Sequence, residues 1–590
     1  MPKHKEIEKA KNFKSSLKEL IIHLKKYIPA ILIATIFSLR STVLAIIGPE
    51  KLSELTNEIK VGLIDSINMG NIYSISNFVI ILCLFSVICE LVQGFIMVDV
   101  SQNFSRELRT KTSEKINRIP LKYFDSRPVG DILSIVTNDI DTIFDGLNQG
   151  LGNLSYAVIS LIGVSFMMFN INWQMSLTAV VSTIIGFLLV GMIISKSNKY
   201  FKAQQKNLGK LNGYIEEMYS CHSIVSVYNG IDETTKQFEK LNNKLYKSSQ
   251  KAFFLGSVMQ PLMAFAGNFG YIAVCVVGAI LTMNEIIDFG TIIAFIFYVR
   301  LFSNPISTIA QSITKMQSVV AAAERVFEFL NLEELPSESH ITTVLDSNKV
   351  KGNIVFEHVK FGYDENIVIK DFSANIKAGQ KVAIVGPTGA GKTTLVNLLM
   401  KFYDIDSGDI IIDGYSIKEL SRENIHELFC MVLQNTWLFK GTIKENVIYN
   451  QTHLSDKDVI DACKLADIDD FINSLPDKYD TMLDDNENLS EGQKQLLTIA
   501  RAILDDSPFL ILDEATSSVD RKTEEIVQRA MDNLTKDRTS FIIAHRLSTI
   551  QNADLILVLN DGDIVEQGTH EELLKKNGFY AELYNSQFEV

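Results

Sequence analysis

The spacing of hydrophobic and polar residues changes near residue 330 and divides the chain into two parts. The first part contains six long apolar runs, each near the roughly twenty residues that a helix needs to cross a bilayer; they cover 27–47, 76–98, 150–169, 173–195, 253–283 and 290–313. The second part alternates short β-branched segments, such as "QKVAIVG" and "PFLILDEAT", with helical patterns. The pattern predicts an all-α membrane domain with six helices, followed by an α/β domain.

The segments that flank these runs set the expected domain boundaries. Before the first run, apolar residues follow the i, i+3, i+4, i+7 spacing of an amphipathic helix: Leu17, Leu20, Ile21 and Leu24. Residues 1–26 are therefore expected to form an interfacial segment; a signal peptide is disfavoured, because no small-residue cleavage site follows the run. The membrane domain then covers 27–330, a polar linker with a proline covers 331–349, and the α/β domain covers 350–590.

The distribution of lysine and arginine predicts the orientation in the membrane. The segment between the second and third runs and the segment between the fourth and fifth runs are both rich in these residues, so both should face the cytoplasm. Each is about fifty residues long and keeps helical periodicity, which predicts long helices that extend below the bilayer. Connectors are expected at Tyr123–Ser134, broken by Pro128 and Gly130, and at Asn212–Val225.

Composition narrows the class of function. The formal net charge of -14 argues against nucleic acid as a main partner, and the mean hydropathy of +0.14 fits a chain that is only partly embedded in a membrane. The six cysteines show no C-x-x-C spacing, so neither a metal site nor a disulfide framework is expected.

Two stretches of the α/β domain carry phosphate chemistry. The first is a G-x-x-x-x-G-K-[ST] loop at Gly386–Thr393, between a buried strand and a helix, in which Lys392 would reach the β- and γ-phosphates and Thr393 would ligate Mg²⁺. The second is "FLILDEAT", where Asp513 and Glu514 follow a buried strand. Asp513 would hold the metal through water, and Glu514 would orient or deprotonate the attacking water.

With these motifs, residues 350–590 resemble the nucleotide-binding domain of the ATP-binding cassette (ABC) superfamily. In the membrane half, "YFDSRPVGDILSIVTNDIDTI" and "NGYIEEM" resemble the intracellular segments of its exporter branch. The resemblance implies a six-helix exporter-type membrane domain fused to an α/β P-loop ATPase domain with a helical subdomain. It further implies ATP-driven export across the cytoplasmic membrane by alternating access, with ATP and Mg²⁺ as cofactors and small molecules, drugs, lipids or peptides as cargo.

The resemblance also assigns roles to single positions. Tyr363 would stack on adenine, although a tyrosine at a strand end also packs against an edge; His545 would contact the γ-phosphate, and Asp520 would communicate with the opposite site. The implied nucleotide contacts are Tyr363, Gly386, Pro387, Thr388, Gly389, Ala390, Gly391, Lys392, Thr393, Thr394, Gln434, Asp513, Ser490, Gly492, Gln493 and Asp520. The implied metal ligands are Thr393, Gln434 and Asp513, and the implied catalytic residues are Glu514, His545, Gln434 and Lys392.

The stretch "LSEGQ" at 489–493 resembles the ABC signature, which caps a nucleotide held by the phosphate loop of a different subunit. The chain then carries two half-sites and has to dimerise. Glu491 stands where glycine is usual, and the stretch before the signature lacks the usual glycine and arginine. These departures favour a heterodimer in which this chain supplies the catalytic loop and its altered signature caps a weaker site; a homodimer is the alternative.

Charged residues in or near the membrane runs leave the cargo open. They are Arg40, Glu90, Asp99 and Arg300. Arg40 and Arg300 either line a pathway for an anionic or amphipathic cargo or snorkel from helix ends. Two other classes are disfavoured: a soluble cassette ATPase of the DNA-repair type by the six apolar runs, and an ATP-gated channel by the intact Glu514.

Overall fold

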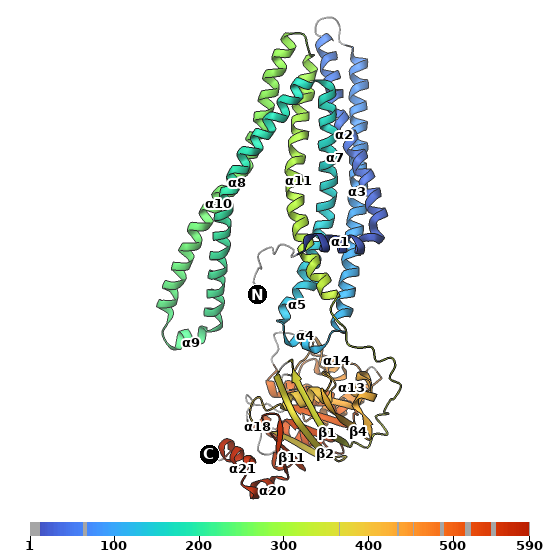
Figure 1. Ribbon diagram of the computed structural model, residues 1–590, viewed down its shortest axis with the longest axis vertical. Helices are drawn as coiled ribbons and strands as arrows, with labels where there is room; N and C mark the ends of the chain where they lie inside the picture. Colours follow the sequence, from blue (N-terminus) through green and yellow to red (C-terminus); the bar gives the residue numbers. More distant parts are fainter. Residues whose placement is uncertain are drawn as a thin grey trace. The chain divides into compact units, whose positions relative to one another are not determined.

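The computed structural model describes residues 12–62, 68–364, 366–433, 436–451, 453–483, 489–513, 521–543 and 550–588. The chain forms two compact units (Figure 1). The first contains Met1–Ile119 and Arg127–Glu333, and the second contains Pro120–Ser126 and Glu334–Val590. A short segment from the membrane half of the sequence thus belongs to the C-terminal unit.

Six long helices build the first unit (Figure 1). They are α2 (Ile28–Gly62), α3 (Met69–Ile116), α7 (Gly152–Ile171), α8 (Trp173–Ser220), α10 (Ile231–Met283) and α11 (Phe289–Leu330). Within the described residues, four helical stretches are long and apolar enough to cross a membrane, at 13–62, 69–116, 129–171 and 289–330. Shorter apolar stretches lie in α8, at Trp173–Leu188, and in α10, at Gly267–Met283. The six predicted runs fall on these six helices.

Capping and packing explain how these helices are arranged. Asn172 ends α7 and caps α8, because its side-chain oxygen accepts the amides of Gln174 and Met175, both at 3.0 Å. Two hydrogen bonds join α2 to α11: the amide of Gly290 donates to Asn57 Oδ1 at 2.9 Å, and the hydroxyl of buried Tyr298 donates to the carbonyl of Ile46 at 3.1 Å. They fix these two antiparallel helices in register.

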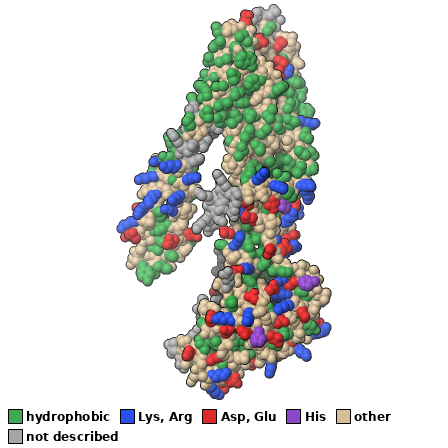
Figure 2. Space-filling model, in the orientation of Figure 1, with side chains coloured by type: hydrophobic (Ala, Val, Ile, Leu, Met, Phe, Trp, Pro, Cys, Tyr) green, Lys and Arg blue, Asp and Glu red, His purple; other side chains and the backbone are tan. Residues whose placement is uncertain are grey.

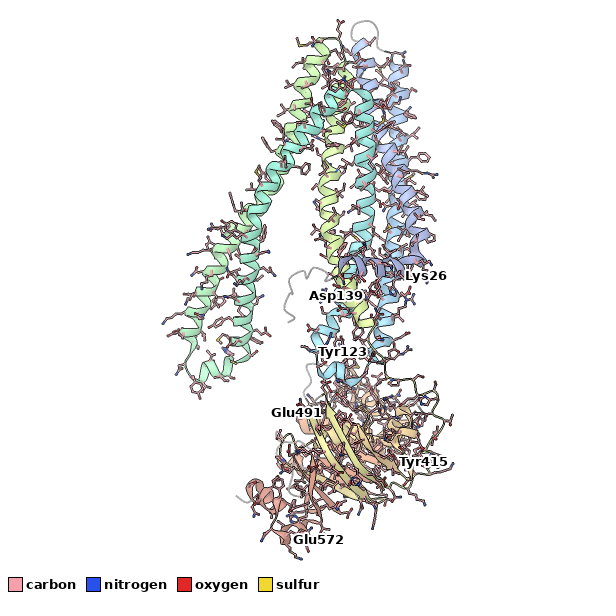
Figure 3. All side chains as sticks on the ribbon, in the orientation of Figure 1. Lys26, Tyr123, Asp139, Tyr415, Glu491 and Glu572 are labelled. Carbon is pink, nitrogen blue, oxygen red and sulfur yellow. The ribbon has the colours of Figure 1, made fainter. Side chains whose placement is uncertain are left out.

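A second core lies at the other end of α11, where α1 (Phe13–His23) and η1 (Leu24–Tyr27) pack. Leu20 and Leu24 are buried there beside Phe327, while Ile21 and Ile22 are exposed. Asp139, 7% exposed at its side chain and labelled in Figure 3, accepts two hydrogen bonds from the guanidinium of Arg325. This ion pair ties the segment between α3 and α7 to α11.

Five short elements follow α3 and form the first connector. They are α4 (Leu121–Asp125), α5 (Val129–Ser134), the π-helical η2 (Ile135–Asp139), α6 (Ile140–Asp145) and the π-helical η3 (Gly146–Leu151). Pro128 lies at the N-cap of α5, so the helix is interrupted there, as its missing amide predicts. Gly130, in contrast, lies inside α5 and does not interrupt the helix.

The second connector is shorter than the sequence indicated. Helix α8 continues through Asn212 to Ser220, and the turn is α9 (His222–Val227). Helices α8 and α10 pack against each other as a long hairpin that leans away from the other helices of this unit (Figure 1).

The second unit is a ten-stranded sheet with the order β5-β4-β1-β2-β12-β11-β3-β10-β9-β6. The strands are β1 (Ile354–Tyr363), β2 (Asn366–Ile376), β3 (Lys381–Val385), β4 (Ser407–Ile412), β5 (Tyr415–Ser416), β6 (Phe429–Val432), β9 (Phe509–Asp513), β10 (Thr539–Ile543), β11 (Leu555–Asn560) and β12 (Asp563–Gly568). Five strands pair in parallel: β6, β9, β10, β3 and β11. Their side chains are apolar and buried on both faces of the sheet, because helices cover both faces. The strands β1, β2, β4 and β5 pair antiparallel.

Helices surround this sheet in two groups. Those on the sheet are α12 (Lys392–Leu399), η4 (Ile417–Glu419), α13 (Arg422–Leu428), α18 (Arg521–Leu534), α20 (His570–Lys576) and α21 (Phe579–Phe588). The helical subdomain contains β7 (Gly441–Thr442), α14 (Ile443–Ile448), α15 (Asp456–Leu465), α16 (Asp469–Ser474), η5 (Lys478–Asp480), β8 (Met482–Leu483) and α17 (Glu491–Leu504). Its apolar side chains share one core with residues of β6, β9, β10 and α18. The predicted fold class, a helical membrane domain followed by an α/β domain with a helical subdomain, is confirmed.

Candidate nucleotide site

The phosphate loop lies between β3 and α12, as the motif requires. Gly389 and Gly391 have φ values of +86° and +100°, which favour glycine, and Gly391 forms the start of α12. A Cβ at Gly386 would lie 2.3 Å from the carbonyl oxygen of Leu559, so this position has no room for a side chain. The loop therefore keeps a backbone path that turns amides and the N-terminus of α12 toward one point.

Lys392 is held against its own loop. Its ammonium donates to the carbonyl oxygen of Gly386 at 2.7 Å and of Pro387 at 3.1 Å. Burial lowers the pKa of Lys392, and the carboxylate of Asp513 partly opposes this effect. The lysine is thus a desolvated positive charge beside the loop, which suits it to a phosphate group.

Asp513 reaches the same edge of the sheet from β9. In the parallel pairing, Asp513 is opposite Ile543 of β10, and Ile543 is opposite Ile384 of β3, one residue before the end of that strand. The carboxyl ends of these strands therefore meet where the phosphate loop begins. The oxygen donors of Asp513 and Thr393 have the hard chemistry that Mg²⁺ prefers. No cluster of three or more His, Cys, Asp or Glu side chains that could hold a metal occurs within the described residues.

Tyr363 lies at the end of β1, close to the start of α12. Its hydroxyl is 3.4 Å from Oγ1 of Thr394, which places the ring beside the phosphate-loop helix. The ring also packs edge-on against Phe361 and Tyr403, with centroids 5.0 and 5.1 Å away. The position of Tyr363 therefore fits both interpretations, stacking on adenine and packing at a strand edge. One edge of the ring packs within the domain, and the side chain is only half-buried.

The signature stretch begins α17 with a capping box. Ser490 Oγ accepts the amide of Gln493 at 3.3 Å, and the Gln493 side chain accepts the amide of Ser490 at 2.9 Å. Gly492 is buried, whereas the side chain of Glu491 is 63% exposed and its carboxylate is 3.3 Å from the ammonium of Lys494. Leu496 and Leu497 belong to the core that the helical subdomain shares with β6, β9, β10 and α18, which differs from the core that contains α12.

Four predicted site residues lie outside the described residues: Gln434, Glu514, Asp520 and His545. The roles assigned to them stay predictions. Among the described residues, the structure brings together Tyr363, the phosphate loop and Asp513, while Ser490, Gly492 and Gln493 lie at the start of α17 in the helical subdomain.

The structure adds a contact to this site that the sequence did not indicate. Lys122 of α4 forms an ion pair with Asp364, the residue after Tyr363, and the hydroxyl of Tyr403 donates to Asp125 of α4. Burial and this hydrogen bond raise the pKa of Tyr403, so it remains a donor. Tyr403 and Asp125 are 278 positions apart, and no local pattern in the sequence relates them.

Comparison with known proteins covers almost the whole chain. The family model of the ABC transporter transmembrane region matches residues 31–306, and that of the ABC transporter matches residues 369–517. A fatty acid ABC transporter ATP-binding/permease protein of Mycobacterium bovis is 43% identical over 478 residues, which cover 81% of this chain and 75% of that protein. An uncharacterised ABC transporter ATP-binding protein of Bacillus subtilis is 35% identical, with 98% and 96% covered. An ATP-dependent lipid A-core flippase of Syntrophus aciditrophicus is 33% identical, with 85% and 83% covered.

Proposed function

Because the chain belongs to the ABC transporter family, as an exporter half-transporter with an ATPase domain, we propose that it exports an anionic lipid-type amphiphile as one half of a dimer. ATP binding between two such chains would close the ATPase domains and turn the membrane helices outward, and hydrolysis would reset them. The cytoplasmic membrane is the proposed location, with both chain ends in the cytoplasm, on the basis of the lysine and arginine distribution.

The proposed chemistry uses the geometry of the phosphate loop. The amides of the loop and of the α12 N-terminus would bind the phosphates, and the ammonium of Lys392 would exchange its two carbonyl partners for phosphate oxygens. Thr393 and Asp513, with Gln434, would hold Mg²⁺, which neutralises charge on the phosphates. Glu514 would position the attacking water, and His545 would contact the γ-phosphate.

The contacts of α4 support a link between nucleotide binding and the membrane helices. Helix α4 directly follows α3 in the chain yet belongs to the ATPase unit. It contacts Asp364, the residue after Tyr363, and Tyr403, whose ring packs against that of Tyr363. A shift of Tyr363 on adenine binding would therefore reach α4 through one ring contact and one hydrogen bond, and from there the end of α3.

The tip of the α8–α10 hairpin supports the requirement for a second chain. Tyr219, Val227 and Tyr228 are 84%, 76% and 81% exposed, although they are large and apolar or aromatic. A soluble surface rarely exposes such residues together unless a partner covers them. The proposed partner is the ATPase domain of the second half-transporter. A heterodimer is favoured because Glu491 departs from the usual signature, and a homodimer remains the alternative.

Two arginines favour an anionic cargo. The two hydrogen bonds between α2 and α11 align these helices, so that Arg40 and Arg300 lie at similar depths, about one helical turn apart. Both lie more than ten residues inside their helices and are exposed, and neither has an ion-pair partner among the described residues. Their depth is greater than snorkelling from a helix end readily explains. Arginines at such depth usually face a cavity, where they would attract a carboxylate or phosphate.

The relatives are consistent with this cargo. One is named for fatty acids and another for lipid A-core, and both cargoes join an acidic group to long apolar chains. Peptides and neutral drugs are the alternative cargo, and an ATP-gated channel is the alternative activity.

The observation that carries the proposal is the attachment of α4 to the residues around Tyr363, because it connects the nucleotide site with a membrane helix. The test uses the chain with its partner, purified from the native membrane and reconstituted in vesicles with a fluorescent fatty acid. We expect ATP-dependent movement of the fatty acid, abolished by Glu514→Gln with ATP binding retained. Equal movement in the variant would contradict the proposal, and ion flux without net fatty-acid transport would favour the channel.

A further inference from the structure

Eight lysines form two rows on the α8–α10 hairpin. In each row the lysines are three or four residues apart and therefore follow one side of their helix. The rows are Lys199, Lys202, Lys206 and Lys210 on α8, and Lys240, Lys244, Lys247 and Lys251 on α10. All eight are exposed, and we call them the lysine face.

The two rows lie on the same side of the hairpin. The helices pack through Asn207 and Leu211 of α8 and Ser248 and Ala252 of α10, with Asn207 donating to Ser248 Oγ at 3.1 Å. Each lysine row precedes the packing positions by one residue, a rotation of about 100° around the helix axis. Because the helices are antiparallel, this rotation carries both rows to the same side. Figure 2 shows Lys and Arg side chains gathered on this part of the hairpin.

The charge of the lysine face is not balanced locally. The segments 199–210 and 240–251 contain no Asp or Glu. None of the eight lysines has an ion-pair partner in the described part of the chain, and Lys251 lies over the ring of Tyr200 at 5.6 Å. This concentration of positive charge occurs in a chain with a formal net charge of -14. It therefore calls for an anionic partner.

The position of the lysine face along the hairpin identifies the partner. Exposed Phe253 and Phe254 follow Lys251 and the buried Ala252, and they begin the apolar part of α10. The row from Lys199 to Lys210 extends on the order of 17 Å away from the apolar part of α8. That reach covers the headgroup layer and about one further Debye length, over which a charged leaflet attracts lysine.

The other end of the hairpin has a different character. Around the apolar tip the charges are mainly acidic: Glu216, Glu217, Asp232 and Glu233. Figure 2 shows this change from blue to red along the hairpin. The tip is the part suited to a protein partner, and the lysine face is the part next to the bilayer.

We propose that the lysine face binds the phosphate groups of anionic phospholipids in the leaflet next to it. Its two rows present several ammonium groups to one surface, so it should bind a cluster of headgroups instead of a single lipid. The interaction is independent of the transported cargo and of the ATPase cycle. An acidic protein surface is the competing partner, and the experiment separates the two.

The test measures lipid selectivity of the full-length chain in nanodiscs. Spin-labelled phosphatidylglycerol and spin-labelled phosphatidylcholine are compared by the fraction of label immobilised at the protein. We expect the natural chain to select phosphatidylglycerol. Replacement of Lys199, Lys202, Lys247 and Lys251 with Gln should reduce this selectivity at least about threefold, and 0.5 M salt should reduce it by a similar factor. Replacement of the same four lysines with Arg should keep the selectivity and report on folding.

The matched control removes four exposed lysines from the ATPase unit: Lys360, Lys377, Lys457 and Lys536, each changed to Gln. It lowers the net charge equally and should leave the lipid selectivity unchanged. Equal selectivity in the natural chain and the four-Gln variant of the lysine face overturns the proposal. Loss of a co-purified protein from that variant, with lipid selectivity intact, would assign the face to a protein and overturns it too.

Discussion

Glu491 occupies the first position of α17, where an anion has two opposing effects. It stabilises the positive end of the helix, and it would repel the γ-phosphate that a signature caps. Its pairing with Lys494 at 3.3 Å reduces that repulsion. For Glu491→Gln we therefore expect only a modest gain, no more than about fivefold, in ATP affinity at the site of the partner chain.

The measurement is the binding of a fluorescent ATP analogue to the assembled pair of chains, with Glu491→Asp as the control that keeps the charge. A gain of tenfold or more would mean that Lys494 does not screen Glu491 in the assembled site.

Glu338 holds the linker on the ATPase unit by a half-buried charge cluster. Its carboxylate accepts the amide of Arg422 at 2.6 Å and pairs with Lys401 and the Arg422 guanidinium, both at 2.9 Å. Burial alone would raise the pKa of Glu338, but these donors together hold it below the ordinary value of 4.5. The folded state then binds fewer protons than the unfolded state, so this contribution to stability is complete above pH 4.5 and is lost as pH falls through the lower folded pKa.

We expect Glu338→Gln to destabilise the ATPase unit by about 1–3 kcal/mol at pH 7, because it leaves Lys401 and Arg422 without their shared anion. Calorimetry of the full chain from pH 7 to pH 4 should show a difference from the natural chain that shrinks as the pH falls. The exposed Glu419→Gln serves as control, and a difference that grows toward low pH would contradict this account.

At the scale of elements, glycine permits the contact between η3 and α11. A Cβ built on Gly146 would lie 1.8 Å from Cγ2 of Val319. We expect Gly146→Ala to destabilise the membrane unit by about 1–3 kcal/mol, in spite of alanine's higher helix propensity. Thermal denaturation of the full chain in detergent measures the change.

Two further variants test the cause of that loss. In Gly94→Ala, within α3, the added Cβ has no atom within 4 Å, so stability should be unchanged or slightly higher. Val319→Ala combined with Gly146→Ala should recover part of the loss, because it removes the clashing methyl groups. An additive double variant would show that the clash is not the cause.

The features that the sequence predicted depend on residues close together in the chain, whereas the features that it missed join residues far apart in the chain. The six membrane helices and the phosphate loop come from contiguous patterns, since apolar length and glycines at fixed spacing act locally. The pair between Asp139 and Arg325 joins residues 186 positions apart, and the contact between Tyr403 and Asp125 joins residues 278 positions apart. Periodicity indicates that a face is buried but does not identify what buries it. The end of α8 was placed too early because Asn212 and Gly213 are residue types that often end a helix, whereas α8 continues through both of them to Ser220.

At the scale of the whole molecule, the function requires that a change at the nucleotide site reach the membrane helices. The described contacts of α4 differ in strength. The pair between Lys122 and Asp364 is exposed, at 58% and 72%, and should contribute little. The hydrogen bond from Tyr403 to Asp125 involves a half-buried ring that also packs on Tyr363 at 5.1 Å. We therefore expect the tyrosine contact to carry most of the coupling.

Tyr403→Phe keeps the ring packing and removes only the hydroxyl that Asp125 accepts. We expect this variant to bind ATP normally and hydrolyse it at the basal rate, but to lose several-fold in stimulation by cargo, since the coupling free energy between two sites is typically 1–3 kcal/mol. Asp125→Asn should have a smaller effect, because an amide oxygen still accepts the bond, and Lys122→Gln should have almost none. The measurement is ATPase activity of the reconstituted transporter with and without fatty acid. If Lys122→Gln uncouples more strongly than Tyr403→Phe, the signal passes through the surface ion pair, and the route through the edge-to-face contact between Tyr363 and Tyr403 is wrong.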